Sequence, residues 1–233
     1  MKKYLIALLV LASAFVNAYA QKYEPRESWP YLYENFQSGA VRTLSGSLVE
    51  NSTFNISIAD GSLHYIVDGK IMKIDMMTIY TARVGGQVFV NVGGKMYQVL
   101  AETDNGSLLQ FYSIDFDKLD KVDIGYGISS SSASAMNVTS LLQGMDSMVN
   151  THFDTAMEKR DNGIVLPQLI EKFIYVDGKL VPASKYGVRE FPGIDKDAAN
   201  AFFKEKKIKW NKDESLAELI DFVHEQIVKP RFK

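Results

Sequence analysis

Histidines are the side chains in this sequence with the most chemistry to offer, and their spacing limits what they can do. His64, His152 and His224 lie in separate parts of the chain. None has a second histidine at the spacing of a zinc-binding helix, and a three-histidine site would need all of them to converge. We therefore expect no metal and no cofactor, and we interpret each histidine as a packed or surface residue.

Carboxylates and serines offer two further kinds of chemistry. Asp115, Asp117, Asp120 and Asp123 form an acidic run, but it lacks the glycine and the terminal glutamate of a calcium loop, so we interpret it as a solvated strand end. The serine-rich string 127–131 lacks the second glycine of a nucleophile elbow. Hydrolysis would have to use carboxylates that the sequence does not single out among its 28 acidic residues.

Aromatic side chains gather ahead of the first expected strand, at Trp29, Tyr31, Tyr33 and Phe36. Aromatic faces bind sugars and protein partners well, so these four form a candidate binding patch. The alternative is that the N-terminal segment uses them to pack onto the sheet.

These residues need elements to position them, and the segment 40–116 supplies a pattern with a period of two. Phe54, Ile56 and Ile58 alternate with polar residues, and such alternation predicts strands with one face on a core and the other toward water. Pairs such as Asp68-Gly69 recur between the strands and fit tight hairpin turns. The spacing predicts an antiparallel meander.

The C-terminal part predicts a hairpin followed by two helices. The hairpin turns at Asp177-Gly178, and Asp195 is placed to cap a helix that runs to about residue 207. Asn211 and Glu214 are placed to cap a second helix. Its core-facing stripe follows a helical period: Leu216, Leu219, Ile220, Val223 and Ile227.

The N-terminus has the pattern of a cleavable signal peptide. Lys2 and Lys3 precede an apolar run, and Ala18-Tyr19-Ala20 supplies the small residues that a signal peptidase requires. We expect cleavage after Ala20, and no other stretch is long and apolar enough to span a membrane. The chain has no cysteine, and its net charge of −2 makes nucleic acid an unexpected partner.

Turns, caps and the aromatic lead-in follow one another in a distinctive order, at residues 31–39, 97–100, 125–127, 173–179, 182–185, 191–192 and 208–214. This order resembles a family of small exported β-rich proteins of unknown function that is common in Bacteroidetes. The resemblance covers residues 31–228 and implies a periplasmic or cell-surface location, but it carries no active-site residue to this chain. Ser147 and Thr155 each follow an aspartate and precede an apolar residue, which resembles the O-glycosylation sequon of such exported proteins.

The sequence therefore predicts an α+β protein, mainly an antiparallel β-meander or sandwich with C-terminal helices packed on it. We divide it into a signal peptide (1–20), a β-rich domain (21–124), a serine-rich loop with a possible helix (125–163), and a C-terminal part (164–233) packed on the β-rich domain. For function we expect a non-enzymatic envelope protein that binds a protein or glycan partner. The alternative is a hydrolase that acts on glycans or envelope polymers.

Overall fold

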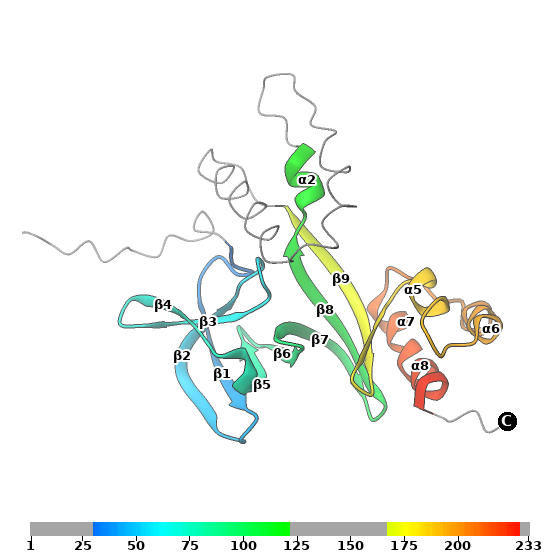
Figure 1. The fold of residues 1–233 in the computed structure, drawn as a ribbon, viewed down its shortest axis with the longest axis horizontal. Coiled ribbons are helices and arrows are strands. Elements are labelled where there is room, and N and C mark those ends of the chain that lie inside the picture. The colour runs from blue at the N-terminus through cyan, green and yellow to red at the C-terminus, as the bar shows by residue number, and fades with distance from the viewer. Residues whose placement is uncertain (1–29, 122–166, 229–233) are drawn as a thin grey trace, which may run out of the picture.

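The computed structural model describes residues 30–121 and 167–228, and these form one sheet with helices at its C-terminal end (Figure 1). The serine-rich loop and the helix expected within residues 125–163 lie outside the described residues. The strands are β1 (Gln37–Thr43), β2 (Leu48–Ile56), β3 (Leu63–Val67), β4 (Lys70–Lys73), β5 (Ile79–Val84), β6 (Gln87–Val92), β7 (Lys95–Thr103), β8 (Gly106–Ile114), β9 (Gln168–Val176) and β10 (Lys179–Pro182).

The ten strands pair in the order β10-β9-β8-β7-β6-β5-β1-β2-β3-β4, and every pair is antiparallel. The sheet thus consists of two meanders, β1–β4 and β5–β10, joined where β1 pairs with β5. Tight turns connect the hairpins, and both residues of Asp68-Gly69 and of Asp177-Gly178 have positive φ, as turns of this kind require. The expected α+β class and the meander are confirmed.

The sheet curves into a half-barrel at its N-terminal end (Figure 1). Side chains from β1, β2, β3, β5, β6 and β7 fill its concave side, with Phe54, Leu63 and Phe89 fully buried. The short helical turn η1 (Met76–Thr78) leads into β5 and adds Met76 to this core. The apolar core of the half-barrel therefore lies on one face of the sheet, the concave face.

One expectation about the alternation in β2 is wrong. Asn55 and Ser57 were expected to face water, yet they are 0% and 3% exposed. The reason is the lead-in segment, residues 30–36, which runs beside the end of β2. Leu32 N–H donates to Ile56 O at 2.9 Å, and Ile58 N–H donates to Pro30 O at 2.7 Å. The lead-in covers polar positions that the local pattern assigns to solvent.

The helices are α2 (Phe116–Lys121), α5 (Lys185–Arg189), α6 (Lys196–Lys206), α7 (Asp213–Ala217) and α8 (Leu219–Val228). Asp195 caps α6 as expected, since its Oδ1 accepts hydrogen bonds from the backbone N–H groups of Asp197 and Ala198. The expected second helix is instead divided into α7 and α8, and its N-cap is Lys212 rather than Asn211. The helices of residues 30–121 and 167–228 include none with the length and hydrophobicity that a membrane span requires.

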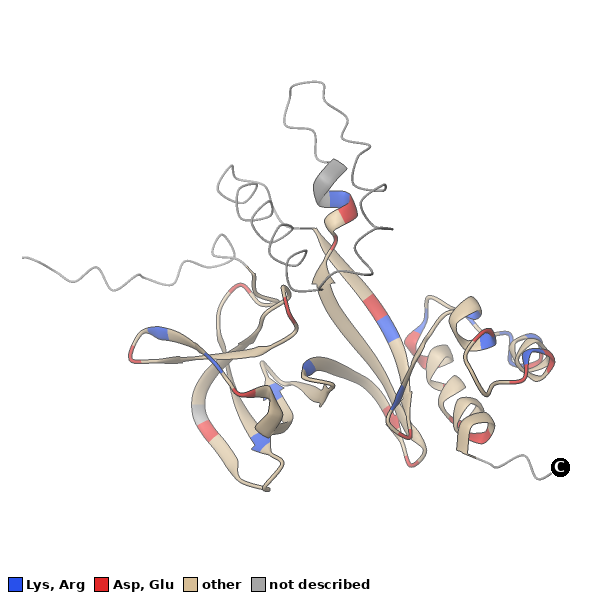
Figure 2. Cartoon of the chain, viewed as in Figure 1, with Lys and Arg blue, Asp and Glu red and all other residues tan. Residues whose placement is uncertain are grey.

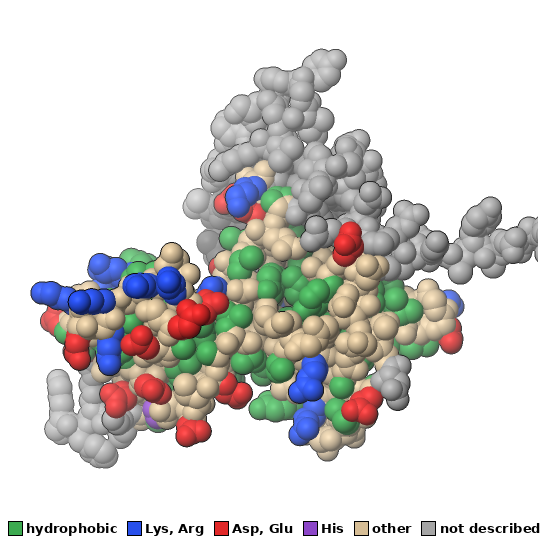
Figure 3. All heavy atoms as spheres, turned by 180° about the vertical axis from the view of Figure 1, so that it is seen from behind, with side chains coloured by type: hydrophobic (Ala, Val, Ile, Leu, Met, Phe, Trp, Pro, Cys, Tyr) green, Lys and Arg blue, Asp and Glu red, His purple; other side chains and the backbone are tan. Residues whose placement is uncertain are grey.

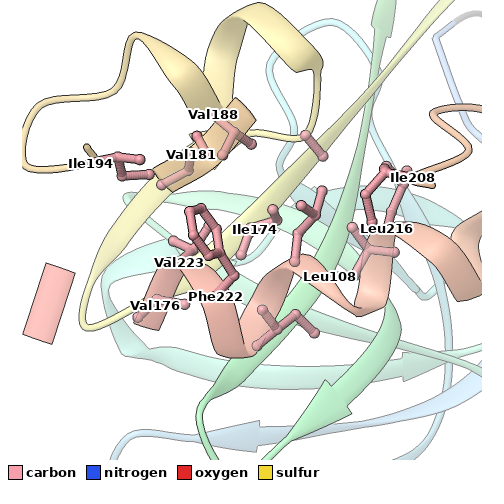
Figure 4. Close-up of a cluster of buried hydrophobic side chains, with 14 of the residues drawn as sticks. Leu108, Ile174, Val176, Val181, Val188, Ile194, Ile208, Leu216, Phe222 and Val223 are labelled. Carbon is pink, nitrogen blue, oxygen red and sulfur yellow. The ribbon is translucent and has the colours of Figure 1, made fainter. Parts of the chain in front are cut away.

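The C-terminal helices cover the far end of the same sheet face (Figure 4). Leu216, Leu219, Ile220 and Val223 are buried against Leu108, Ile174 and Val176 of β8 and β9, so the predicted helical stripe is confirmed. On the opposite face, a smaller cluster contains Tyr97, Leu109 and Phe111 with Phe173 and Tyr175 beside them. Seen from behind Figure 1, hydrophobic side chains gather in the middle of the molecule between charged residues on both sides (Figure 3).

Candidate functional site

A chain of polar side chains centred on His64 looks at first like a catalytic group. Ser62 Oγ lies 2.9 Å from His64 Nε2, and Tyr31 Oη lies 2.8 Å from His64 Nδ1. Ser62 Oγ also lies 2.6 Å from Asp60 Oδ1, and Lys73 Nζ lies 2.7 Å from Asp60 Oδ2. Asp60 and Ser62 lie in the loop between β2 and β3, His64 lies on β3, Lys73 lies at the end of β4, and Tyr31 comes from the lead-in segment.

One arrangement of protons fits these contacts. The carboxylate of Asp60 can only accept, so the single hydroxyl proton of Ser62 points to Asp60. Ser62 Oγ must then accept from His64 Nε2–H, which leaves His64 Nδ1 to accept from Tyr31 O–H. In this arrangement, His64 does not take the proton of Ser62, as a nucleophilic dyad would require.

The pKa shifts of the two titratable partners, Asp60 and His64, agree with a structural role. Burial would raise the pKa of Asp60, but hydrogen bonds from Lys73, Ser62 and Ser57 outweigh it and hold that pKa well below its usual range. Burial lowers the pKa of His64, with the charge of Asp60 acting in the opposite direction. Ser62 is only 1% exposed. We conclude that this group fixes the β2–β3 loop and holds no nucleophile at the surface.

The predicted aromatic patch is only partly covered by the described residues. Trp29 lies outside them, whereas Tyr31, Tyr33 and Phe36 are half-buried. The rings of Tyr31 and Phe36 pack edge to face at 4.9 Å, and Tyr31 also packs on His64. Tyr33 contacts the half-barrel core. These three side chains therefore pack on one another, on His64 or on the half-barrel core, and each keeps part of its surface accessible.

A second polar group lies on the concave face of the sheet and consists of Gln87, Gln98, Gln110 and Tyr112, here called the glutamine band. Gln98 and Gln110 are directly opposed on β7 and β8. Gln110 Nε2 donates to Tyr112 Oη, Tyr112 O–H donates to Gln98 Oε1, and Gln98 Nε2 donates to Gln87 Oε1 at 2.9 Å. The four side chains thus form one hydrogen-bonded row across three strands.

The glutamine band separates the two large apolar cores. Residues two apart on a strand share a face, and opposed residues on neighbouring strands do too. Gln98 is opposed to Phe89 of the half-barrel core, and Gln110 lies two residues from Leu108 of the helical core. The band side chains are half-buried or exposed, unlike those of the cores on either side. Polar atoms are therefore left accessible between two closed regions of the same face.

Groups beside the band leave its local charge close to balanced. Lys172 on β9 is opposed to Gln110 and forms an ion pair with Asp213 of α7. Strands β6 and β8 carry no charged residue, and elsewhere basic and acidic residues are interspersed (Figure 2). Burial raises the pKa of Tyr112, with Gln110 and Lys172 acting against it. Burial, followed by the charge of Tyr112, raises the pKa of Tyr33. Both phenols therefore stay protonated near neutral pH.

The sequence carries only a weak signal for this site. Gln98, Gln110 and Tyr112 occupy polar positions within otherwise apolar strands, as many solvent-facing residues do. Only the pairing of β6, β7 and β8 shows that they adjoin one another. The chemistry that such a group supports is hydrogen bonding, because glutamine and tyrosine each offer a donor and an acceptor.

The remaining candidates from the sequence fall elsewhere. His152, Ser147 and Thr155 lie outside the described residues, and His224 is half-buried on α8. The expectation that the acidic run begins as a solvated strand end is wrong for Asp115, which is 9% exposed. It accepts a hydrogen bond from Lys118 N–H in the first turn of α2, and its Oδ2 lies 3.0 Å from Lys118 Nζ.

Asp60 and Glu190 are carboxylates whose pKa is shifted, and both shifts are downward. The pKa of Glu190 is lowered by hydrogen bonds from Lys196 and Arg189. Neither is suited to act as a general acid, which needs a raised pKa. Within the described ranges, no three histidine or acidic side chains lie close enough together to hold a metal ion.

Comparisons with known proteins bring no relative to this arrangement. No family model, no curated protein and no solved structure matches the chain.

Proposed function

We propose that this chain is an exported, non-enzymatic binding protein of the bacterial envelope and that it holds its partner at the glutamine band. The observation that carries the proposal is the position of the band, where accessible hydrogen-bonding groups lie between two closed apolar cores. Binding sites typically combine apolar surroundings with a few convergent polar groups. The expected signal peptide, with cleavage after Ala20, supports the location in the periplasm or at the cell surface.

The rigidity of the surrounding structure also supports a binding role. Gln98, Gln110 and Tyr112 stand on central strands, each paired on both sides, and their side chains hold one another. Sites built on paired strands are more precise than sites on loops, because their side chains lose little freedom when a partner binds. The band therefore offers a preorganised set of donors and acceptors.

The test uses the full chain, expressed in a diderm bacterium so that the leader is processed, with N-terminal sequencing expected to begin at Gln21. The purified protein is immobilised on a biosensor and exposed to a soluble extract of bacterial envelope. We expect retention by the wild-type protein and loss of most of it in the double variant Gln98→Ala/Tyr112→Phe. Gln226→Ala on α8 is the matched control, since within residues 30–121 and 167–228 the side chain of Gln226 bonds only to the backbone N–H of Asp195.

Two results would contradict the proposal. Equal retention by the wild-type protein and the double variant would remove the band as the binding site. Progressive shortening of the extracted polysaccharide by the wild-type protein, measured by size-exclusion chromatography, would instead favour the hydrolase alternative.

A further inference from the structure

The composition of the glutamine band limits the chemistry of the partner, and this step rests on the function proposed above. In the row Gln110–Tyr112–Gln98–Gln87, each bond uses one donor and one acceptor. Within the described part of the chain, Gln110 Oε1 receives no hydrogen bond and Gln87 Nε2 gives none. The band therefore presents an acceptor at one end, a donor at the other, and second amide protons between them.

A ligand that fits this pattern must both donate and accept at several points. Hydroxyl groups do both, whereas carboxylates and phosphates only accept and would leave Gln110 Oε1 without a donor. An anionic ligand would also need an unbalanced positive charge to offset its loss of hydration. The ammonium group of Lys172, which is opposed to Gln110 on the next strand, is already paired with Asp213. The band is thus suited to a neutral ligand rich in hydroxyl groups.

Apolar contacts beside the band agree with a sugar ring, which has hydroxyl edges and C–H faces. Ile170 is opposed to Tyr112 across β8 and β9 and is 52% exposed. The rings of Tyr112 and Tyr33 supply aromatic surface next to the polar row, and tyrosines combine such surface with a hydroxyl. A ligand with hydroxyls alone would leave these apolar atoms uncovered.

The length of the band indicates more than one sugar unit. Neighbouring strands lie about 4.8 Å apart, so the distance from β6 to β8 is about 10 Å, and β9 adds a further step. We infer that the glutamine band of this protein binds a neutral oligosaccharide laid across strands β6 to β9.

Nuclear magnetic resonance of the full processed chain tests this inference through the side-chain amides of glutamine. The probes are neutral gluco-, manno- and galacto-oligosaccharides of two to four units and, as the charged comparison, oligogalacturonates of the same lengths. We expect at least one neutral series to shift the amide signals of Gln98 and Gln110. Gln98→Ala should weaken that binding about tenfold, as expected for the loss of one to two ligand hydrogen bonds.

Two further variants separate lost contacts from lost folding. Tyr112→Phe removes one hydroxyl and keeps the ring, and we expect weaker binding with an unchanged backbone spectrum. Gln226→Ala on α8 should bind as the wild-type protein does. A variant that loses binding together with the dispersed spectrum has unfolded, and Tyr112→Phe then provides the decisive comparison.

The outcomes distinguish the ligand class from the proposed function. Preference for oligogalacturonates, weakened by Gln98→Ala, would overturn the neutral class and leave the binding function in place. If no oligosaccharide binds but the biosensor retains an envelope protein through the band, the neutral-sugar class is likewise overturned and the binding function stands. Absence of oligosaccharide binding together with absence of band-dependent retention would overturn both.

Discussion

Asn55 should be among the most sensitive positions in the protein, because one buried amide holds the lead-in to the sheet. Asn55 is 0% exposed to solvent. Oδ1 accepts from the backbone N–H groups of Tyr33 at 3.1 Å and Ile56 at 2.9 Å, and Nδ2 donates to Tyr33 O at 2.8 Å. We predict that Asn55→Ala lowers the free energy of unfolding by about 3 kcal/mol, since it removes these bonds and leaves buried backbone groups unpaired.

Thermal and urea unfolding measure this loss. For a chain of this size, about 3 kcal/mol corresponds to a fall in Tm of about 6–12 °C. Thr53→Ala is the matched control on the same strand, because Thr53 is exposed and should change stability by less than about 0.5 kcal/mol. If Asn55→Ala unfolds within about 2 °C of the wild-type protein, the lead-in is not held by this amide and our account of its burial is wrong.

Asn55→Asp provides a second, independent test of the same hydrogen bonds. It keeps an acceptor but loses the donor to Tyr33 O and places a carboxylate in a buried site. Burial raises the pKa of such a carboxyl group, so the folded state takes up a proton more readily than the unfolded state. The defect should therefore be largest near neutral pH and shrink as the pH falls, because the protonated group can donate again. A defect independent of pH would refute this explanation.

Three further predictions concern separate parts of the fold. The pKa of His64 in the folded protein lies below its ordinary 6.5, so the stability that His64 contributes is present above pH 6.5. That contribution is lost as the pH falls through the pKa of the folded state. His64→Asn should therefore flatten the acidic part of the plot of unfolding free energy against pH, measured by urea unfolding. Gly61→Ala should cost about 1–3 kcal/mol more than Gly69→Ala in thermal unfolding. Both glycines have positive φ, but an added Cβ meets the Phe111 ring at 2.8 Å at Gly61 and nothing within 4 Å at Gly69, so equal losses would contradict the clash. Asp195→Ala should remove the N-cap of α6 and lower stability by about 1 kcal/mol, read from the urea midpoint.

Local features were the ones that the sequence predicted well. The turns at Asp68-Gly69 and Asp177-Gly178 and the cap at Asp195 depend on residues within a few positions of one another. The division of the last helix was missed, although its buried stripe was found. The helical period of the apolar residues continues across Glu218, so the stripe alone does not show that the helix ends and restarts there.

Features that depend on distant parts of the chain were missed. The burial of Asn55 requires Tyr33, which lies on another segment, and an isolated polar position in a strand pattern indicates a solvent face by default. The glutamine band requires the register of β6, β7 and β8, and Lys172 joins its edge from more than sixty residues further along the chain. The polar residue types show which face of a strand these side chains occupy, but only the pairing of the strands shows that they lie beside one another.

The two polar groups of this protein show why hydrogen-bond satisfaction distinguishes a structural network from a binding site. Around His64, Ser62 is almost fully buried, and both ring nitrogens are used within the protein. Such a group stabilises the fold by leaving nothing unpaired. In the glutamine band, Gln110 Oε1 and Gln87 Nε2 have no partner among the described residues, and the side chains remain partly accessible. Polar groups that the fold holds in place without satisfying can gain hydrogen bonds from a ligand, and this is why we place the function at the band rather than at the histidine.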